Sequence, residues 1–274
     1  MAQNKSLGVC VLLSCMHQKD DSIVERTNIQ TDVVVINQCD EERIIERVLV
    51  NKKGRACNVL FICTKERGLS RSRNMGIRYA TQPICLLCDD DEVLDDNYEE
   101  KILRAYSEHI DEACILFMVE RKDCEIPKKY PATPRKVGLI QILQSSSVQI
   151  TFCPEIIVHN NIMFDTQLGS GTGNGGGEEN KFLLDIRREH LSIYYVPVNI
   201  GAVLTGNSMW FTGYTTQYLI NLGWSSRRSL GSVLGLAYIL LFWVRHYDVI
   251  SKEQPALKGV SFLFKGYFET RAEK

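Results

Sequence analysis

Three consecutive carboxylates, Asp89, Asp90 and Asp91, follow a short apolar run and form the clearest chemical signal in the chain. Neighbouring carboxylates repel one another, and each loses hydration on burial, unless a positive charge lies among them. Oxygen ligands without a nearby His or Cys favour Mg²⁺ or Mn²⁺, which commonly complete their shell with substrate phosphates. The cluster therefore indicates a divalent cation and a nucleotide diphosphate. The alternative is a solvated acidic turn that caps the following helix.

A basic segment, residues 67–76, lies just upstream of the aspartates and includes Arg67, Arg71 and Arg73. Helix N-termini and arginine side chains both bind phosphate oxygens. On their own, these arginines are typical of a solvated helix face. Their place in the same strand, loop and helix unit as the aspartates favours a phosphate site.

A glycine-rich loop, residues 169–177, leads into two adjacent glutamates, Glu178 and Glu179. Part of this loop satisfies the bare dinucleotide-binding pattern, but no clear apolar strand precedes it. The two carboxylates would also repel a pyrophosphate at the start of the next helix. The sequence thus argues against an oxidoreductase, and it favours a flexible loop on the acceptor side of a site.

An alternation of strands and helices must position these residues. Short apolar runs predict strands, and polar segments with apolar residues at helical spacing predict helices. The predicted strands are 7–14, 33–37, 59–64, 84–88 and 114–119, and the predicted helices are 20–30, 70–80, 97–109 and 178–189. We expect Ser70 to cap its helix. The pattern predicts an α/β fold with an open, mostly parallel sheet, in which ligands bind beyond the carboxyl ends of the strands.

Composition limits the classes of function. The chain has 274 residues with 32 Lys plus Arg against 33 Asp plus Glu, so it lacks the overall basic charge that favours nucleic acid as a partner. The ten cysteines are mostly in apolar runs, as expected of buried thiols in a reducing compartment. The Cys85 and Cys88 pair has zinc-like spacing but no second pair. With no secretion signal recognised at the N-terminus, a cytoplasmic location is expected.

The order of these motifs resembles that of the family 2 glycosyltransferases, which have the GT-A fold. The resemblance depends on Gly68, on the run Arg73-Asn74-Met75-Gly76, and on an apolar strand that ends in Asp89-Asp90-Asp91. It extends to Gly177-Glu178-Glu179-Asn180, which is similar to the acidic pair that opens a helix in that family. It implies a mostly parallel nucleotide-binding sheet flanked by helices.

The resemblance also implies roles for individual residues. Asp89 and Asp90 would contact the nucleotide, Asp91 with Asp89 would hold Mg²⁺ or Mn²⁺, and Arg73 with its neighbour Asn74 would lie near the base or phosphates. Glu179 would be the base that takes the proton of the acceptor hydroxyl, with Glu178 in reserve. The implied reaction is an inverting, hexosyltransferase-type displacement from a nucleotide-sugar donor.

One departure from the family pattern concerns the nucleoside. The second strand of that family usually ends in an acidic pair, whereas this chain has Ile36-Asn37-Gln38-Cys39-Asp40. We therefore expect the nucleoside to be held by Asn37, Gln38 or Asp40, together with Ser14 at the end of the first strand. Amide side chains can read uracil, which favours a UDP-sugar.

The C-terminal part changes in character and predicts a second unit. We expect the GT-A domain to cover residues 1–214 and a helical extension to cover 215–274. The apolar stretch 230–244 is shorter than the roughly 20 residues that span a bilayer, and aromatic and basic residues alternate in 258–274. Peripheral binding to the inner face of the cell membrane, with a glycan or lipid-linked glycan as acceptor, is one hypothesis. The other is that the apolar stretch forms a helix buried against the catalytic domain. A sugar nucleotidyltransferase and an inactive nucleotide-sugar-binding protein are the alternative functions.

Overall fold

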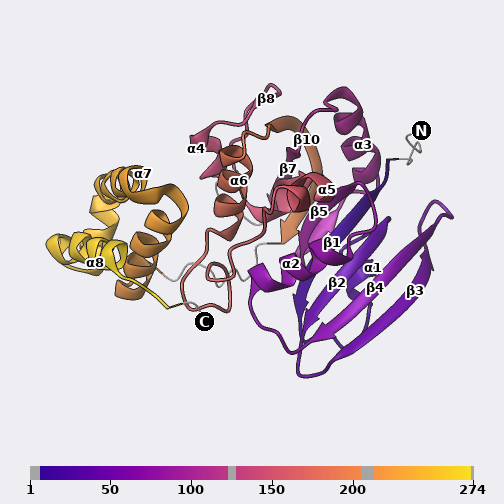
Figure 1. The fold of residues 1–274 in the computed structure, drawn as a ribbon, viewed down its shortest axis with the longest axis horizontal. Helices are drawn as coiled ribbons and strands as arrows, with labels where there is room; N and C mark the ends of the chain where they lie inside the picture. The colour runs from indigo at the N-terminus through magenta and orange to yellow at the C-terminus, as the bar shows by residue number, and fades with distance from the viewer. Residues whose placement is uncertain (1–6, 123–127, 205–212, 273–274) are drawn as a thin grey trace.

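A ten-stranded sheet forms the centre of the larger part of the molecule (Figure 1). The computed structural model describes residues 7–122, 128–204 and 213–272. The strand order is β3-β4-β2-β1-β5-β9-β7-β10-β6, and β8 pairs with β10. The strands are β1 (Val9–Met16), β2 (Asp32–Gln38), β3 (Arg43–Val50), β4 (Ala56–Thr64), β5 (Ile84–Asp89), β6 (Glu92–Leu94), β7 (Cys114–Lys122), β8 (Arg135–Lys136), β9 (Ile150–Phe152) and β10 (Ile193–Leu204).

The sheet is mostly but not purely parallel, as the sequence predicts. Strands β1, β2, β4 and β5 pair in parallel, and β7 pairs in parallel with β10. Strands β3, β6, β8 and β9 run against their neighbours. Because β1 lies between β2 and β5, the connections leave β1 in opposite directions along the sheet, and this is where open α/β sheets bind ligands.

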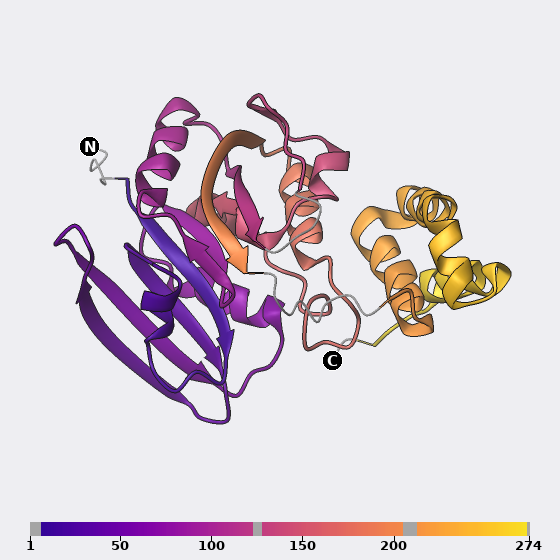
Figure 2. The same cartoon turned by 180° about the vertical axis from the view of Figure 1, so that it is seen from behind.

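Helices cover both faces of the sheet (Figures 1 and 2). The buried apolar residues of α1 and α3 join one core cluster, and those of α2, α4, α5 and α6 join the other. Alternate residues of β1 point to opposite faces, so Val11 belongs to the first cluster and Leu12 to the second. The helices of this part are α1 (Ile23–Arg26), α2 (Leu69–Tyr79), α3 (Tyr98–Glu108), α4 (Leu139–Ile142), α5 (Pro154–His159) and α6 (Glu178–Arg188), and Ser147–Gln149 forms the short 3-10 helix η1.

The structure corrects one local prediction at the start of α2. Ser70 does not cap this helix, because the N-cap residue is Gly68, with φ 119°. The Ser70 hydroxyl instead donates to the carbonyl of Leu168, 2.7 Å away. Ser70 thus connects the first turn of α2 with the chain that leads into the glycine-rich loop.

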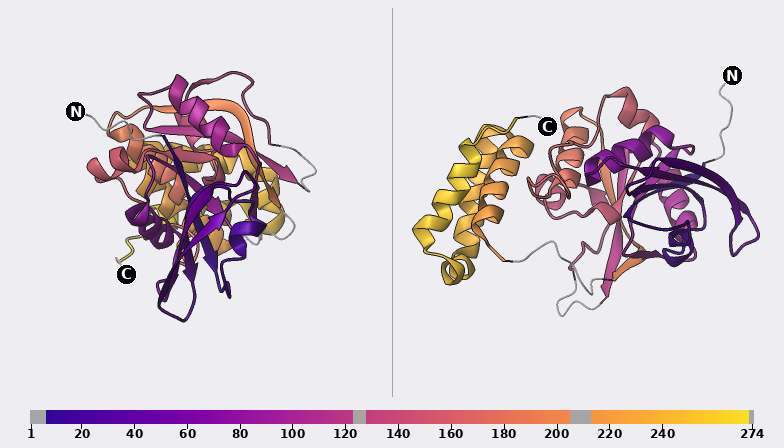
Figure 3. Two further views of the ribbon diagram at one scale, coloured as in Figure 1. Left: turned by 90° about the vertical axis from the view of Figure 1, so that its right-hand side faces the viewer. Right: turned by 90° about the horizontal axis from the view of Figure 1, so that it is seen from below.

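The C-terminal helices form a separate lobe beside the sheet domain (Figure 3). Helix α7 (Thr216–Glu253) is broken at Gly231, whose φ of 78° is not helical, and α8 (Ala256–Phe268) packs back against it. Gly223 and Gly266 permit this packing, since a Cβ at either position would collide with the backbone of the facing helix. By length and composition alone, α7 is long and apolar enough to cross a membrane, and 17% of its most apolar stretch is buried.

Candidate active site

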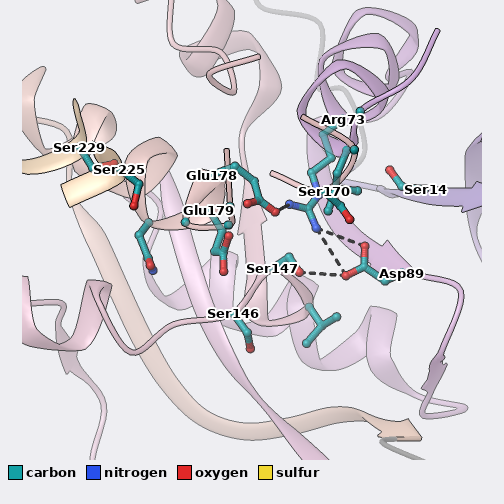
Figure 4. Close-up of a pocket in the computed structure, with 18 of the residues that line it drawn as sticks. Ser14, Arg73, Asp89, Ser146, Ser147, Ser170, Glu178, Glu179, Ser225 and Ser229 are labelled. Carbon is teal, nitrogen blue, oxygen red and sulfur yellow. Dashed lines mark hydrogen bonds and ion pairs between the residues drawn. The ribbon is translucent and has the colours of Figure 1, made fainter. Parts of the chain in front are cut away.

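A cavity of 1220 Å³ opens at the carboxyl ends of the central strands (Figure 4). Ser14 of β1, Gln38 of β2 and Asp89 of β5 line it from the sheet. The start of α2, the start of α6 and the first part of α7 close the other sides. The cavity therefore occupies the place where the sequence predicts a ligand.

A buried arginine connects the basic segment with both acidic motifs. The side chain of Arg73 is 1% exposed, and it donates from Nη2 to Asp89 at 3.2 Å and from Nη1 to Glu178 at 3.0 Å. Burial opposes the charge of Arg73, but the carboxylates of Asp89 and Glu178 outweigh it, so the arginine pKa is raised. Its guanidinium also lies 5.5 Å from the centre of the Phe164 ring. This network fixes α2, β5 and α6 relative to one another.

A serine that carries no sequence motif completes this network. Ser147 of η1 donates from Oγ to Asp89 Oδ2 at 3.0 Å. Asp89 is thereby held from two sides, by Arg73 and by Ser147. Nothing in the local sequence marks Ser147, because its approach to Asp89 depends on the antiparallel insertion of β9 beside β5.

Asp90 and Asp91 lie beside Asp89 along the cavity wall. Burial raises the pKa of both carboxyls, and repulsion from Asp89 raises each of them further. This is the electrostatic cost that a nearby cation would relieve.

The carboxylates at this wall can share a cation but cannot enclose one. Among the described residues, no three His, Cys, Asp or Glu side chains gather closely enough to hold a metal ion. Mg²⁺ is commonly held by one or two carboxylates, with substrate phosphates and water completing its shell. The donor set fits a cation that is shared with a bound diphosphate. Asp89 is already paired with Arg73 and Ser147, so Asp90 and Asp91 are the carboxylates less engaged by other described side chains.

The two glutamates of α6 differ in environment. Both line the cavity, but Glu178 is buried and paired with Arg73, whereas Glu179 is only partly buried. Burial, and then the adjacent charge of Glu178, raise the pKa of Glu179 to about 8. A carboxyl with this pKa can take up and release a proton near neutral pH.

The glycine-rich loop comes close to side chains of α2, α6 and α7. Gly169 has φ 99°, and a Cβ there would lie 3.1 Å from Ser70 Oγ and 3.2 Å from Glu178 Cδ. Gly175 has φ 89°, and a Cβ there would lie 3.2 Å from Asn221 Cβ of α7. Glycine is needed at these positions for both backbone conformation and space.

Three residues predicted to bind the nucleotide do not line the cavity. Asn37 uses its amide to hold the backbone of Gln18, and Asn74 exchanges two hydrogen bonds of 2.8 Å with the backbone of Phe164. Asp40 is exposed and pairs with Arg67 at 2.6 Å. The cavity is instead lined by Ser14, Gln38, Arg73, Asp89, Asp90, Asp91, Glu178 and Glu179.

Gln38 and Ser14 are themselves oriented by neighbours. The Gln38 Oε1 atom accepts from the backbone N–H of Gly68 at 2.7 Å. The Ser14 hydroxyl pairs with the Ser72 hydroxyl at 2.8 Å. Both bonds connect a strand end with the start of α2, so the wall below the cavity is held before any ligand binds.

The Cys85 and Cys88 pair lies in the core and does not line the cavity. Cys85 and Cys88 are buried in β5, and burial raises the pKa of both thiols well above the usual value. This agrees with the expectation that they belong to the core.

Comparison with known proteins places the chain in a family. The model of glycosyl transferase family 2 matches residues 15–157, just over half of the chain. No curated protein gives a match. Among solved structures, TarS of S. aureus (residues 1–349) superposes with a TM-score of 0.60 at 14% identity, over 96% of this chain and 81% of that one.

The complexes of that protein superpose in the same way. The structure with UDP-GlcNAc has a TM-score of 0.59 at 14% identity and covers 88% of this chain and 73% of TarS 1–349. The structure with UDP has a TM-score of 0.56 at 14% identity and covers 90% and 73%. Identity at this level shows a shared fold, and the family model carries the assignment: the chain belongs to glycosyl transferase family 2.

Proposed function

We propose that this protein transfers a sugar from a UDP-sugar to a hydroxyl of a glycan or lipid-linked glycan, with inversion at the anomeric carbon. The observation that carries the proposal is the convergence of Arg73, Asp89 and Glu178 with a second glutamate, Glu179, in one cavity at the carboxyl ends of parallel strands. Membership in a glycosyltransferase family favours sugar transfer over nucleotidyl transfer.

The donor nucleotide is proposed from two observations. Gln38 offers an amide at the end of β2, where the family pattern usually has acidic residues. The structurally similar TarS has been crystallised with UDP and with UDP-GlcNAc. Both support UDP as the nucleotide, with Ser14, Gln38, Asp89 and Asp90 around the nucleoside and phosphates.

The proton transfer is assigned to Glu179. As the acceptor hydroxyl oxygen attacks the anomeric carbon, its proton passes to the Glu179 carboxylate and the bond to the UDP oxygen breaks. Glu178 cannot serve as readily, because it is buried against Arg73. Its role is to hold Arg73, which in turn positions Asp89.

A divalent cation would be held by Asp91 and by the diphosphate, with Asp89 beside it. Mg²⁺ or Mn²⁺ supplies positive charge that offsets the charge developing on the leaving UDP. The raised pKa values of Asp90 and Asp91 support this placement, because uncompensated carboxylates repel one another there.

Peripheral membrane association is proposed for the C-terminal lobe. The outer face of α7 after the break carries exposed apolar residues over three turns, among them Val233 (81% exposed), Leu241 (70%) and Val244 (66%). Arg245 and Lys252 lie beside them, with the exposed Asp248 between the two. An apolar stripe next to basic residues suits a helix that lies in the interface of an anionic membrane, which would bring the protein to a lipid-linked acceptor.

The test is release of UDP from UDP-GlcNAc, UDP-glucose and UDP-galactose in the presence of Mn²⁺, with GDP-mannose as the comparison. We expect turnover of at least one UDP-sugar and none of GDP-mannose. Turnover of GDP-mannose alone would overturn the nucleotide assignment, and a protein that binds neither UDP nor GDP would overturn the proposed function.

A further inference from the structure

The C-terminal lobe contributes one entire wall of the catalytic cavity. This wall faces Glu178 and Glu179 across the opening (Figure 4). Among the α7 residues that line it, none carries a charge, and most offer a hydroxyl or an amide. They are Tyr218, Asn221, Leu222, Ser225, Ser226, Ser229, Leu230 and Tyr238, which we call the α7 wall.

The α7 wall is fastened to the sheet domain by specific contacts. Arg228 makes a two-point ion pair with Asp165, with distances of 2.5 and 2.9 Å. Asn221 donates to the carbonyl of Gly173 at 3.2 Å. Arg188 of α6 donates to the carbonyl of Ser229, close to where the first half of α7 ends. The wall therefore has a defined position relative to the glutamates of α6.

The Ser229 hydroxyl of the wall is available to a ligand. Ser229 is 7% exposed, and within the described part of the chain its Oγ makes no hydrogen bond, although its backbone carbonyl does. The hydroxyls of the neighbouring Ser225 and Ser226 both donate hydrogen bonds to the carbonyl of Leu222. Ser229 lines the cavity and its Oγ is not among the fully buried polar atoms of the described residues that lack a partner, so a ligand or water in the cavity can reach this hydroxyl and complete its hydrogen bonding.

The chemistry of the wall selects among ligands. Its hydroxyls and amide can both donate to and accept from the hydroxyls of a sugar, while the faces of tyrosine rings suit the apolar C–H faces of a pyranose. It offers no cation to bind a phosphate or carboxylate, and the opposite wall carries the carboxylates of Glu178 and Glu179. The wall thus suits a neutral, hydroxyl-rich unit.

We propose that the α7 wall is the acceptor subsite and that it binds a neutral sugar unit of the acceptor, with Ser229 hydrogen-bonded to it. This inference rests on the proposed function, since it places the acceptor hydroxyl between the wall and Glu179. It makes the C-terminal lobe a part of the active site as well as a candidate membrane contact.

The experiment separates acceptor use from donor binding. UDP release is measured with a UDP-sugar donor while chitotriose, maltotriose or the anionic hyaluronan tetrasaccharide is titrated as acceptor. We expect a neutral trisaccharide to increase UDP release. Ser229→Ala should raise the KM for that acceptor by roughly 3- to 10-fold, the effect of one neutral hydrogen bond. Ser229→Leu, which also fills space, should raise it further.

Ser251 provides the matched control on the same helix. It is exposed and lies outside the cavity. Its hydroxyl donates a hydrogen bond to the Asp248 carbonyl at 3.2 Å, as the Ser225 hydroxyl does to the Leu222 carbonyl. Ser251→Ala and Ser251→Leu should leave the acceptor KM unchanged, and UDP affinity measured by calorimetry reports whether every variant is folded.

Several outcomes would overturn the acceptor subsite. These are an unchanged KM in both Ser229 variants, an equal change in the Ser251 variants, and stimulation by the anionic tetrasaccharide alone. UDP binding without stimulation by any neutral acceptor would overturn it too. Failure of the wild-type protein to bind UDP would instead overturn the proposed function, and with it this inference.

Discussion

At the scale of single residues, the two adjacent glutamates have separate roles. Both line the cavity, but the carboxylate of Glu178 is paired with Arg73 and that of Glu179 makes no such ion pair among the described residues. We expect Glu179→Gln to lower kcat by roughly 10²- to 10⁴-fold, as for loss of a general base, with UDP affinity unchanged. Glu178→Gln should reduce both kcat and stability. Equal kcat values for Glu179→Gln and the wild-type protein would show that another group is the base.

The raised pKa of Glu179 also predicts a pH dependence. Only the ionised carboxylate accepts a proton, so a pKa of about 8 means that the active fraction grows as pH rises and is lost below that value. We expect the initial rate of UDP release with acceptor to fall about tenfold per pH unit on the acid side and to level off above it. A rate that falls as pH rises through this range would contradict the assignment.

Arg73 is expected to hold the site together. Its removal would leave Asp89 and Glu178 without their buried partner, and breaking a buried ion pair costs roughly 3 kcal/mol or more. Arg73→Met should lower the free energy of unfolding in urea by that amount. Lys52→Met, which breaks the exposed pair with Asp96, should cost less than about 1 kcal/mol. Similar losses in the free energy of unfolding in both variants would contradict a structural role for Arg73.

At the scale of elements, the glycine-rich loop is expected to set the position of Glu178. Gly169→Ala and Gly173→Ala both place a side chain at positive φ, but only the first meets Ser70 and Glu178, while the second meets nothing within 4 Å. Both should lose about 1 kcal/mol of stability. Only Gly169→Ala should also lower kcat, by roughly 10- to 100-fold. Equal kcat values in the two variants would mean that the loop acts only as a connector.

The elements near the acidic motifs could be predicted from sequence, because short apolar runs end abruptly at polar residues there. Strands β1, β2, β4 and β5 and helices α2, α3 and α6 were all expected within a few residues of their observed bounds. Strand β3 is exposed over most of its length, and β9 has three residues, so neither carries a pattern that stands out. Ser147 enters the site through β9, which explains why it was not foreseen.

Only some of the predicted site residues line the cavity. Arg73 and the two acidic motifs meet in one cavity, as the order of motifs implied. Asn37 and Asn74 are buried and bonded to backbone atoms, a use that residue type alone cannot distinguish from ligand binding. The α7 wall could not be foreseen either, because it depends on how a distant helix folds back against the loop.

At the scale of the whole molecule, the lobe of α7 and α8 is expected to reach a membrane surface. The wild-type protein should sediment with vesicles that contain anionic phospholipid. Leu241→Glu should reduce the vesicle partition coefficient roughly 30-fold, since burying a leucine contributes roughly 2 kcal/mol. Val50→Glu is the matched control, because Val50 is 71% exposed against 70% for Leu241 but lies on β3, far along the sheet. Equal loss in both variants, or no binding by the wild-type protein, would contradict the membrane proposal.

The central claim is that the cavity binds a nucleotide diphosphate with a divalent cation. Calorimetric titration of UDP and of GDP into the protein, with and without Mn²⁺, tests it most directly, with Asp91→Ala as the variant. We predict that UDP binds in the presence of Mn²⁺, that its affinity falls when the metal is omitted, and that Asp91→Ala loses the metal-dependent part. Absence of heat from either nucleotide under all of these conditions would contradict the account.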